Sequence, residues 1–226
     1  MDGFTQQRLL RDTRRNWDLF YKRHATRFFK DRHWTSREWP LLETTVSLLE
    51  LGCGVGNLVA PLKQARPNFE IYCCDLSPRA VEFASKHAPA FVCDITTDEI
   101  SLNCPQVHTA TCVFVLSAIA PSNLPATLAN ISRALLPGGT VLVRDYADND
   151  AAQLRFTDKN KMDGGFYARS DGTLTNFFTV ENMHDLFVNA GFKVQECAYV
   201  EKDVVNVKRG ISFGRRFVQG VFSLPQ

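Results

Sequence analysis

A glycine-rich turn and two aspartates have the spacing of a nucleoside-binding site. Residues 50–56 read E-L-G-C-G-V-G after a short apolar run, which predicts a strand-to-helix turn that a ligand can approach closely. Asp75 lies 21 residues after Gly54, at the end of the next apolar run, where a carboxylate can accept both hydroxyls of a ribose. Asp94 ends the third run and could accept the exocyclic amine of an adenine. Singly, Asp75 could be a helix cap and Asp94 a turn residue, but together the three features predict a nucleoside site.

The spacing within the turn separates two classes of cofactor. A nicotinamide dinucleotide needs G-x-G-x-x-G, with a helix N-terminus facing the pyrophosphate. Here Gly52, Gly54 and Gly56 give G-x-G-x-G, and Glu50 stands just before them. An acid beside the turn repels a pyrophosphate, whereas it can hold the ammonium of a methionine moiety directly or through water. The sequence therefore favours S-adenosylmethionine over a dinucleotide.

These residues need a sheet that brings the carboxyl ends of its strands together. Apolar runs predict strands at residues 46–51, 69–75, 90–94, 109–116, 140–146, 192–200 and 215–222. Helical patterns cover residues 5–24, 58–65, 125–136 (ending in Pro137-Gly138-Gly139) and 180–190, and a further helix begins at Ser77-Pro78. The alternation predicts an α/β fold with a mostly parallel seven-stranded sheet and helices on both faces.

Two parts of the chain are expected. Residues 1–45 form an N-terminal helix and a basic, aromatic segment that serves as lid or RNA-binding element. Residues 46–226 form the cofactor-binding domain, with a polar and aromatic insertion on the substrate side at about 147–179.

Composition excludes several other classes of protein. The 226 residues suit one domain, and no stretch has the roughly 20 apolar residues of a membrane span. Seven cysteines without C-x-x-C spacing indicate reduced thiols in a reducing compartment and no metal site. The polar, basic start lacks the apolar core of a secretory signal, and residues 17–34 look folded rather than like a mitochondrial leader. We therefore expect a cytoplasmic protein.

Charge is distributed unevenly along the chain. Residues 1–40 hold ten Lys/Arg and five Asp/Glu, and residues 201–226 hold five and two, although the net charge of the whole chain is only +2. Basic ends around an acidic middle suggest a polyanionic partner gripped by the periphery. A solvated surface of mixed charge explains the counts equally well.

Segments spread over nearly the whole chain resemble the tRNA 3-methylcytidine methyltransferase family, among the class I S-adenosylmethionine-dependent methyltransferases. The similar segments are residues 16–22, 28–34 (F-F-K-D-R-H-W), 52–57, 114–118, 144–146, 153–156 and 171–173. The resemblance implies a Rossmann-like fold and methylation of N3 of a cytidine in the tRNA anticodon loop. It also implies a partner protein in some members, seryl-tRNA synthetase in one branch.

The resemblance also implies which residues lie near the cofactor. These are Trp17, Tyr21, Gly52, Asp75, Asp94 and Val113, to which we add Ile95 beside Asp94. The chain departs from the family pattern at Ala147, where Gly is common, and at Leu174, where Arg is common, and its linker from Asp75 to Asp94 is short. These departures bear on substrate choice more than on chemistry.

Asp145 is the candidate catalytic residue. N3 of neutral cytosine carries a lone pair and needs no strong base, so alignment is the main task. The product base is cationic, and a carboxylate at the end of the fifth strand could stabilise the developing charge. Asp145 stands at that position, although it could equally be a structural partner of Arg144 or of a loop amide.

Aromatic and basic side chains are available to hold a base out of its loop. Stacking faces and phosphate-binding cations are the usual means. The candidate faces are Phe28, Phe29, His33, Trp34, Tyr146 and Phe156, and the candidate cations are Lys30, Arg32, Arg144, Arg155 and Arg169. Phe28, Phe29 and Trp34 could instead pack on the cofactor or core, and Trp17 and Tyr21, one helical turn apart, fit a lid.

Two other functions remain open from the sequence. The chain could methylate a small molecule or a protein side chain, although the basic aromatic N-terminal segment argues against a small substrate. It could also be a non-catalytic cofactor-binding subunit of an RNA-modifying complex, although the intact cofactor carboxylates argue against that.

Overall fold

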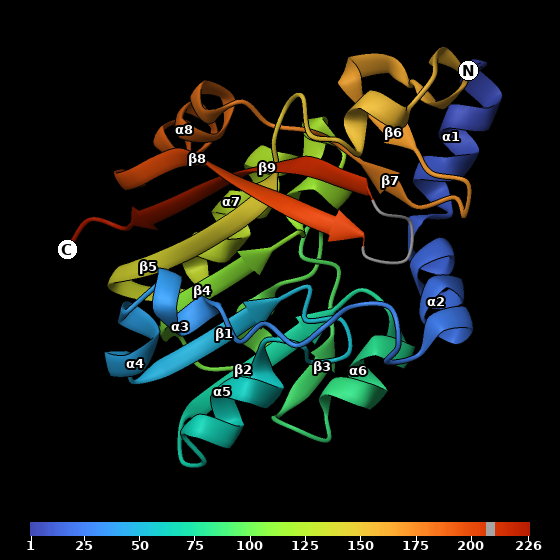
Figure 1. The fold of residues 1–226 in the computed structure, drawn as a ribbon. Coiled ribbons are helices and arrows are strands. Elements are labelled where there is room, and N and C mark those ends of the chain that lie inside the picture. The colour runs from blue at the N-terminus through green and yellow to red at the C-terminus, as the bar shows by residue number, and fades with distance from the viewer. Residues whose placement is uncertain (207–210) are drawn as a thin grey trace.

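A seven-stranded sheet with five parallel strands at its heart organises the molecule (Figure 1). The computed structural model describes residues 1–206 and 211–226, and the side chains of residues 1–203 and 214–226. The parallel strands are β1 (Ser47–Leu51), β2 (Glu70–Asp75), β3 (Ala90–Val92), β4 (Val107–Val113) and β5 (Leu135–Tyr146). Strands β8 (Lys193–Asn206) and β9 (Ile211–Ser223) complete the order β3-β2-β1-β4-β5-β9-β8. The predicted α/β fold is confirmed.

Helices cover both faces of the sheet because its strands alternate apolar side chains between two cores. On β5, Val141 and Val143 enter one core and Leu142 the other. The first core packs under α7 (Leu124–Arg133) and α8 (Val180–Asn189). The second lies against α4 (Leu41–Thr44), α5 (Val59–Ala65) and α6 (Pro78–Ala84), with α3 (Thr35–Glu38) alongside. Short 3-10 helices occupy Ile100–Leu102, Leu116–Ala118, Pro121–Asn123, Gln153–Arg155, Asp158–Asn160 and Asp163–Gly165.

Local capping sets where the ligand-side elements begin. Ser77 caps α6 by accepting from the Ala80 amide at 3.3 Å, with Pro78 in the first turn, as the sequence predicts. Because β1 pairs in parallel with both β2 and β4, the carboxyl ends of these strands lie at one edge of the sheet, and a short loop follows each.

The N-terminal helix is two helices rather than the one predicted over residues 5–24. α1 (Gly3–Arg11) ends at Asp12, and α2 (Thr13–His24) begins directly after it. The apolar pattern could not show the break, because α1 buries no side chain whereas α2 buries Phe20 and Tyr21. In Figure 1 both helices run along one side of the molecule, α1 next to β6 and β7 and α2 nearer to α6.

Other boundaries also differ from the sequence prediction. Helix α7 stops at Arg133, and the Pro137-Gly138-Gly139 segment lies inside β5, where the pairing with β4 shifts register between Val107 and Thr109. Strands β8 and β9 are longer than expected because they pair with each other beyond the sheet, from Val200–Phe217 to Asn206–Ile211. The sequence did not predict this extension, because backbone pairing between two strands beyond the sheet leaves no local pattern.

The insertion at 147–179 carries a small sheet of its own. Strands β6 (Tyr167–Ala168) and β7 (Leu174–Thr175) pair there. A satellite core of Met162, Phe166, Ala168 and Leu174 packs with Leu9 of α1. The insertion and the N-terminal helices are therefore neighbours in space although they lie far apart in the sequence.

Candidate active site

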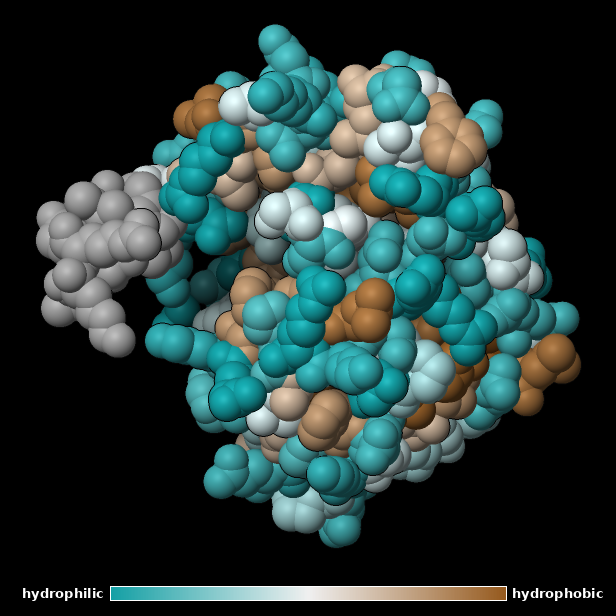
Figure 2. Space-filling view, turned by 90° about the vertical axis from the view of Figure 1, so that its right-hand side faces the viewer, coloured by the Kyte–Doolittle hydropathy of each residue, from teal (hydrophilic) through white to brown (hydrophobic). Residues whose placement is uncertain are grey.

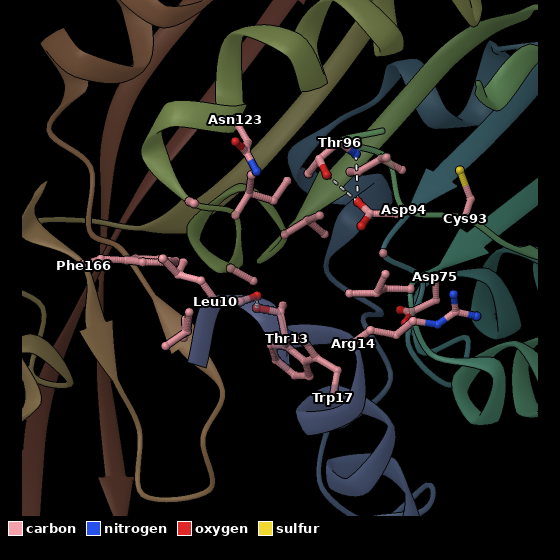
Figure 3. Close-up of a pocket in the computed structure, with 18 of the residues that line it drawn as sticks. Leu10, Thr13, Arg14, Trp17, Asp75, Cys93, Asp94, Thr96, Asn123 and Phe166 are labelled. Atoms are coloured by element: carbon pink, nitrogen blue, oxygen red, sulfur yellow. Dashed lines mark hydrogen bonds between the residues drawn. The ribbon is translucent and has the colours of Figure 1, made fainter. Parts of the chain in front are cut away.

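A cavity of about 390 Å³ lies at the carboxyl ends of the parallel strands (Figure 3). Its lining combines strand-end residues with residues of the N-terminal helices. Six of the predicted cofactor residues line it: Trp17, Tyr21, Gly52, Asp75, Asp94 and Ile95. The structure thus brings most of the predicted cofactor set together.

The turn after β1 needs glycine for space and for backbone conformation. Gly52 has φ of 61°, and a Cβ there would lie 2.6 Å from the side chain of Val115. Gly54 has φ of 55°, and a Cβ there would lie 2.9 Å from the hydroxyl of Tyr21. Gly56, at φ 91°, follows before α5. Of the three glycines only Gly52 lines the cavity, and a side chain at Gly54 would instead displace the Tyr21 ring.

Asp75 stands at the end of β2 as a buried, pre-oriented acceptor. Its Oδ2 accepts from the Gly54 amide at 2.8 Å and its Oδ1 from the Ser77 amide at 2.9 Å. Burial raises the pKa of Asp75 to about 6, and the backbone donors at Ser77 and Gly54 oppose that rise. Each carboxylate oxygen keeps a second lone pair, so the site fits two ribose hydroxyls.

Asp94 and Ile95 also line the cavity. Oδ1 of Asp94 accepts from the amide of Thr96 at 3.0 Å and from its hydroxyl at 2.6 Å, as the dashed lines in Figure 3 show. Within the described part of the chain, Oδ2 of Asp94 has no hydrogen-bond partner. Asp94 is therefore both a turn residue and an available acceptor for an adenine amine.

Helix α2 roofs the cavity. Trp17 and Tyr21 line it, with their ring centroids 6.2 Å apart in a stacked arrangement. Asp18 ties α2 to α6, since its carboxylate accepts from the Ser77 hydroxyl at 2.9 Å and from Nε of Arg79 at 2.8 Å. On the insertion side, Nδ2 of Asn16 donates to the Gly172 carbonyl at 2.9 Å.

Glu50 and Val113 lie beneath the cavity rather than in its lining. Val113 is 4% exposed and packs in the core. Glu50 is 3% exposed, burial raises its pKa well above the usual range, and its Oε2 has no partner in the described structure. A buried carboxylate oxygen without a donor is costly unless a ligand or water reaches it.

A second group of residues forms an aromatic surface beside the cavity. Phe114 belongs to both, because it lines the cavity and its ring centroid lies 4.9 Å from that of Tyr146. Phe217 and Phe177 approach Tyr146 at 6.3 and 6.0 Å. Phe156 stacks on Tyr167 at 5.0 Å and reaches Phe177 at 6.1 Å. We call Phe114, Tyr146, Phe156, Tyr167, Phe177 and Phe217 the aromatic surface.

Two guanidinium groups lie over the aromatic surface. Arg169 and Arg215 are 5.8 and 5.6 Å from the Tyr146 ring. Arg169 also donates to the Leu174 carbonyl at 3.0 Å, and Arg215 pairs with the buried carboxylate of Asp150 at 2.8 Å. Both cations are thus held in place by the insertion and its flanking strand end.

Sequence reasoning missed the part of this surface that comes from strand pairing. Phe217 and Arg215 are on β9, and the antiparallel register places Phe217 opposite Tyr146. No local pattern reports that register. For Phe114 the sequence did offer a signal, since this residue follows an apolar run that ends at the same sheet edge. In the structure its φ of 62° is strained for a bulky residue.

Asp145 lies under the aromatic surface and is completely buried. Its Oδ2 accepts from the Ser117 amide at 2.9 Å and its Oδ1 from the Tyr146 amide at 2.8 Å, while burial raises its pKa to about 6. The sequence allowed either Arg144 or a loop amide as a structural partner of Asp145, and the structure shows the loop amide. The partnership with Arg144 is wrong.

Arg144 is wrong as an RNA contact because it is a core residue. It is 6% exposed, pairs with Glu38 and donates to Gln219. The ring of Trp34 lies 4.0 Å from its guanidinium and 5.4 Å from the Trp39 ring. Trp34 accordingly follows the core-packing alternative rather than the stacking one.

The rest of the basic, aromatic segment remains at the surface. Phe28 is 54% exposed, and its ring packs 4.9 Å from both Phe20 and His24. Phe29 is half-buried against Phe20, whereas Lys30 and His33 are exposed. Arg32 is half-buried over Phe114, and Arg155 is exposed in the insertion. Figure 2 shows that the side carrying α1 and α2 is mostly hydrophilic.

In residues 1–206 and 211–226, no group of three or more His, Cys, Asp or Glu side chains could hold a metal ion. None of the helices in these same residues combines the length and apolar character that crossing a membrane requires.

Comparison with known proteins gives a consistent result. Residues 21–196 match the family described as a methyltransferase domain. The chain is 42% identical over 241 residues to the tRNA N(3)-cytidine methyltransferase METTL6 of Rattus norvegicus, covering 100% of this chain and 84% of that protein. It is 34% identical over 232 residues to the tRNA(Thr) (cytosine(32)-N(3))-methyltransferase of Saccharomyces cerevisiae, covering 94% and 37%. A solved SAM-dependent methyltransferase from Anabaena variabilis shares the fold, with a TM-score of 0.70 at 13% identity over 93% of this chain and 94% of that one.

Proposed function

This chain belongs to the tRNA N(3)-cytidine methyltransferase family, and we propose on that premise that it methylates N3 of a cytidine in a tRNA anticodon loop. The methyl donor is S-adenosylmethionine, which supplies an electrophilic methyl group on a sulfonium sulfur when bound. The observation that carries the proposal concerns Phe114, which lines the nucleoside cavity and also belongs to the aromatic surface. It thereby joins the cavity to a surface suited to a second, flipped base. The relatives' names favour tRNA over a small molecule or a protein side chain.

The cavity supports a fixed orientation of the nucleoside. Asp94 and Asp75 both line the cavity, where Asp94 fits the adenine amine and Asp75 fits the ribose hydroxyls. Trp17 and Tyr21 close the cavity from above and exclude water from the reacting end. The methionine end then points toward Gly52 and Phe114.

The aromatic surface supports binding of the target base. Tyr146 and Phe177 offer stacking faces for a cytosine taken out of its loop. Arg169 and Arg215 lie where they can meet flanking phosphates. Because N3 carries a lone pair, the residues need only align it with the methyl group, and the Asp145 carboxylate below Tyr146 supplies negative charge to the developing cation.

The remaining assignments follow from the same premise. We assign residues 1–45 to lid and RNA contact, residues 46–226 to cofactor binding and 147–179 to the substrate side. The exposed Phe28, Lys30, His33 and Arg155 are the RNA contacts that lie outside the aromatic surface. Seven unpaired cysteines, six of them buried, suit the reducing cytoplasm. A seryl-tRNA synthetase is the partner protein that the family resemblance suggests.

Nucleoside mass spectrometry tests this function. Total tRNA is incubated with the protein and isotopically labelled S-adenosylmethionine, with and without seryl-tRNA synthetase, and digested. We expect labelled 3-methylcytidine, and we expect its loss when the acceptor is a transcript with uridine in place of cytidine 32. Label in any other nucleoside, or in protein rather than RNA, would contradict the proposal.

A further inference from the structure

The loop between β3 and β4 forms part of the cavity wall without a strand or α-helix of its own. Residues 93–96 all line the cavity, and Figure 3 shows Cys93, Asp94 and Thr96 on the side away from Phe166. Apart from the 3-10 turn at Ile100–Leu102, residues 93–106 belong to no helix or strand. The backbone groups of this loop therefore need partners other than a helical or sheet ladder.

Asn130 of α7 joins this loop to the rest of the protein. Its Nδ2 donates to the Ile95 carbonyl at 3.0 Å and to the Asp98 carbonyl at 2.5 Å, and its Oδ1 accepts from the Ile100 amide at 3.4 Å. Within the described residues, every hydrogen bond between residues 94–105 and another segment is one of these three. One side chain thus determines how the backbone of the loop is placed by hydrogen bonds.

An asparagine in the buried face of α7 needs a reason, because it is a poor helix former and a polar group. Asn130 is 4% exposed, and the neighbouring buried side chains of α7 include the apolar Leu128 and Ile131. A carboxamide offers two donors and an acceptor, which are the groups that two carbonyls and one amide require. The isosteric aspartate would keep the acceptor but lose both donors. The residue type therefore fits the loop rather than the helix.

Hydrogen bonds inside the loop carry this placement to Asp94. The Asp94 amide donates to the Asp98 carboxylate at 2.8 Å. The amides of Thr97 and Asp98 donate to the Asp94 carbonyl at 3.0 and 2.7 Å. Residues 94–98 thus form one compact turn, and Asn130 holds it at the carbonyls of Ile95 and Asp98. A shift of this turn would move the Asp94 side chain with it.

The groups that the turn leaves free are complementary to one edge of adenine. In the described structure, Oδ2 of Asp94 accepts no hydrogen bond and the Ile95 amide donates none, and both residues line the cavity. Adenine has a donor, the 6-amino group, next to an acceptor, N1. An acceptor and a donor on adjacent residues can bind this pair only if the turn is held in place.

We propose that Asn130 is a positioning residue for the adenine of S-adenosylmethionine, and that it acts by holding the 94–98 turn so that Asp94 meets the 6-amino group. No residue of α7 lines the cavity, so Asn130 acts through the turn and not by contact. The inference rests on the proposed function only in placing the adenine at Asp94. It assigns part of the selectivity for a 6-aminopurine to a helix outside the site.

Calorimetry with two ligands tests the role without catalysis. S-adenosylhomocysteine and its analogue with hydrogen in place of the 6-amino group are titrated into the wild-type protein and into Asn130→Ala. A hydrogen bond to a charged group changes affinity by about tenfold to a hundredfold, so the wild type should prefer the amino ligand by that factor. Asn130→Ala should lose about tenfold of this preference by binding S-adenosylhomocysteine more weakly, while its affinity for the analogue stays within about threefold.

A double-mutant cycle shows whether Asn130 acts through Asp94. Asp94→Ala should abolish the preference, and adding Asn130→Ala to it should change the ratio of the two affinities no further. Asn130→Asp, which keeps the shape and the acceptor but not the donors, should lose the preference as Asn130→Ala does. Ile131→Val removes buried volume from the same helix without removing a hydrogen bond, so it should lower the melting temperature and keep the preference.

The outcomes separate this inference from a general loss of stability and from the proposed function. If Asn130→Ala and Asn130→Asp weaken both ligands by the same factor, or keep the preference, Asn130 does not position the adenine and the inference is overturned. Equal affinity of the wild type for the two ligands would overturn it as well, together with the adenine contact of Asp94. Failure of the wild type to bind S-adenosylhomocysteine at all would instead overturn the proposed function.

Discussion

At the residue scale, Asp75 combines two demands that oppose each other. It must be ionised to hold ribose hydroxyls well, yet burial raises its pKa to about 6. The buried Asp145 has the same property. The two carboxyls keep their protons to a higher pH in the folded protein than in the unfolded chain. They therefore make the stability of the free protein fall as pH rises from about 4 to about 6.

Cofactor affinity should fall in acid because ligand binding favours ionised Asp75. We expect the affinity for S-adenosylhomocysteine to be constant above about pH 7 and to drop by up to tenfold per pH unit below about 6. Calorimetry across pH 5–8 measures this. Asp75→Asn should bind more weakly at neutral pH and show a flatter profile, whereas an unchanged profile in that variant would assign the titration to another group.

Asp145→Asn distinguishes a positioning role from an electrostatic one. Both carboxylate oxygens accept amide hydrogens, so an asparagine NH2 must face one of those donors. We expect a loss of about 1–3 kcal/mol in the free energy of unfolding, and a slower methyl transfer. Thermal melts beside single-turnover rates give both readouts. A variant with unchanged melting temperature and a rate lower by about 10²–10³-fold would favour direct stabilisation of the base cation.

At the element scale, the roof over the cavity is held by the packing of Phe20 and Tyr21 against Val55 and Ala80 and by a few side-chain hydrogen bonds. Helix α2 is tied to α6 through Asp18 and to the insertion through Asn16. Helix α1 adds one bond, from the Asp163 amide to Oε1 of Gln6 at 2.9 Å. Release of an enclosed ligand then requires these ties to open.

Asp18→Ala should speed cofactor release. The carboxylate is partly exposed, with 27% of its side chain accessible, so its ties contribute modestly, and we expect about three- to tenfold faster dissociation of S-adenosylhomocysteine. Stopped-flow fluorescence of Trp17 at the roof measures the rate. Glu82→Ala, an exposed acid of α6, serves as the control. Equal dissociation rates for Asp18→Ala and the wild type would show that α2 does not gate the cavity.

Sequence patterns predicted best those features that neighbouring residues determine, such as the end of a buried strand and the turn after it. Asp75, Gly52 and the Ser77 cap follow from strand ends and turn chemistry, so they could be read directly. The break at Asp12 could not be predicted, because α1 buries no side chain and apolar periodicity carries no signal there. The length of the β8–β9 hairpin could not be predicted either, because pairing between backbone segments leaves no local pattern. Arg144 was misassigned for a related reason: its partners Glu38 and Gln219 lie 106 and 75 residues away.

At the scale of the whole molecule, the unpaired positive charge gathers on the N-terminal helices. Arg15, Arg23 and Arg27 are exposed and form no ion pair in the described structure. Lys208 and Arg209, which also contribute to the basic ends of the sequence, lie outside the described residues. Arg15 and Arg23 lie on α2 and Arg27 follows just after it, so exposed positive charge is placed along α2 beside the cavity.

Replacing Arg15, Arg23 and Arg27 with Gln should reduce the salt dependence of tRNA binding. Each lost phosphate contact lowers the slope of log affinity against log salt by roughly 0.7–0.9. Filter binding at several salt concentrations measures the slope. Arg133→Gln, an exposed cation near the opposite edge of the sheet, should leave it unchanged. Equal slopes for the triple variant and the wild type would place the RNA on another face.

The position of β9 between β5 and β8 governs when the sheet can close. Strand β8 pairs only with β9, and β5 lacks its second neighbour until β9 arrives. During synthesis, β8 therefore leaves the ribosome before any strand exists for it to join, and the edge of β5 stays open through the whole insertion and α8. Such an edge is a site for wrong pairing, so refolding yield should depend on how fast the last hairpin docks.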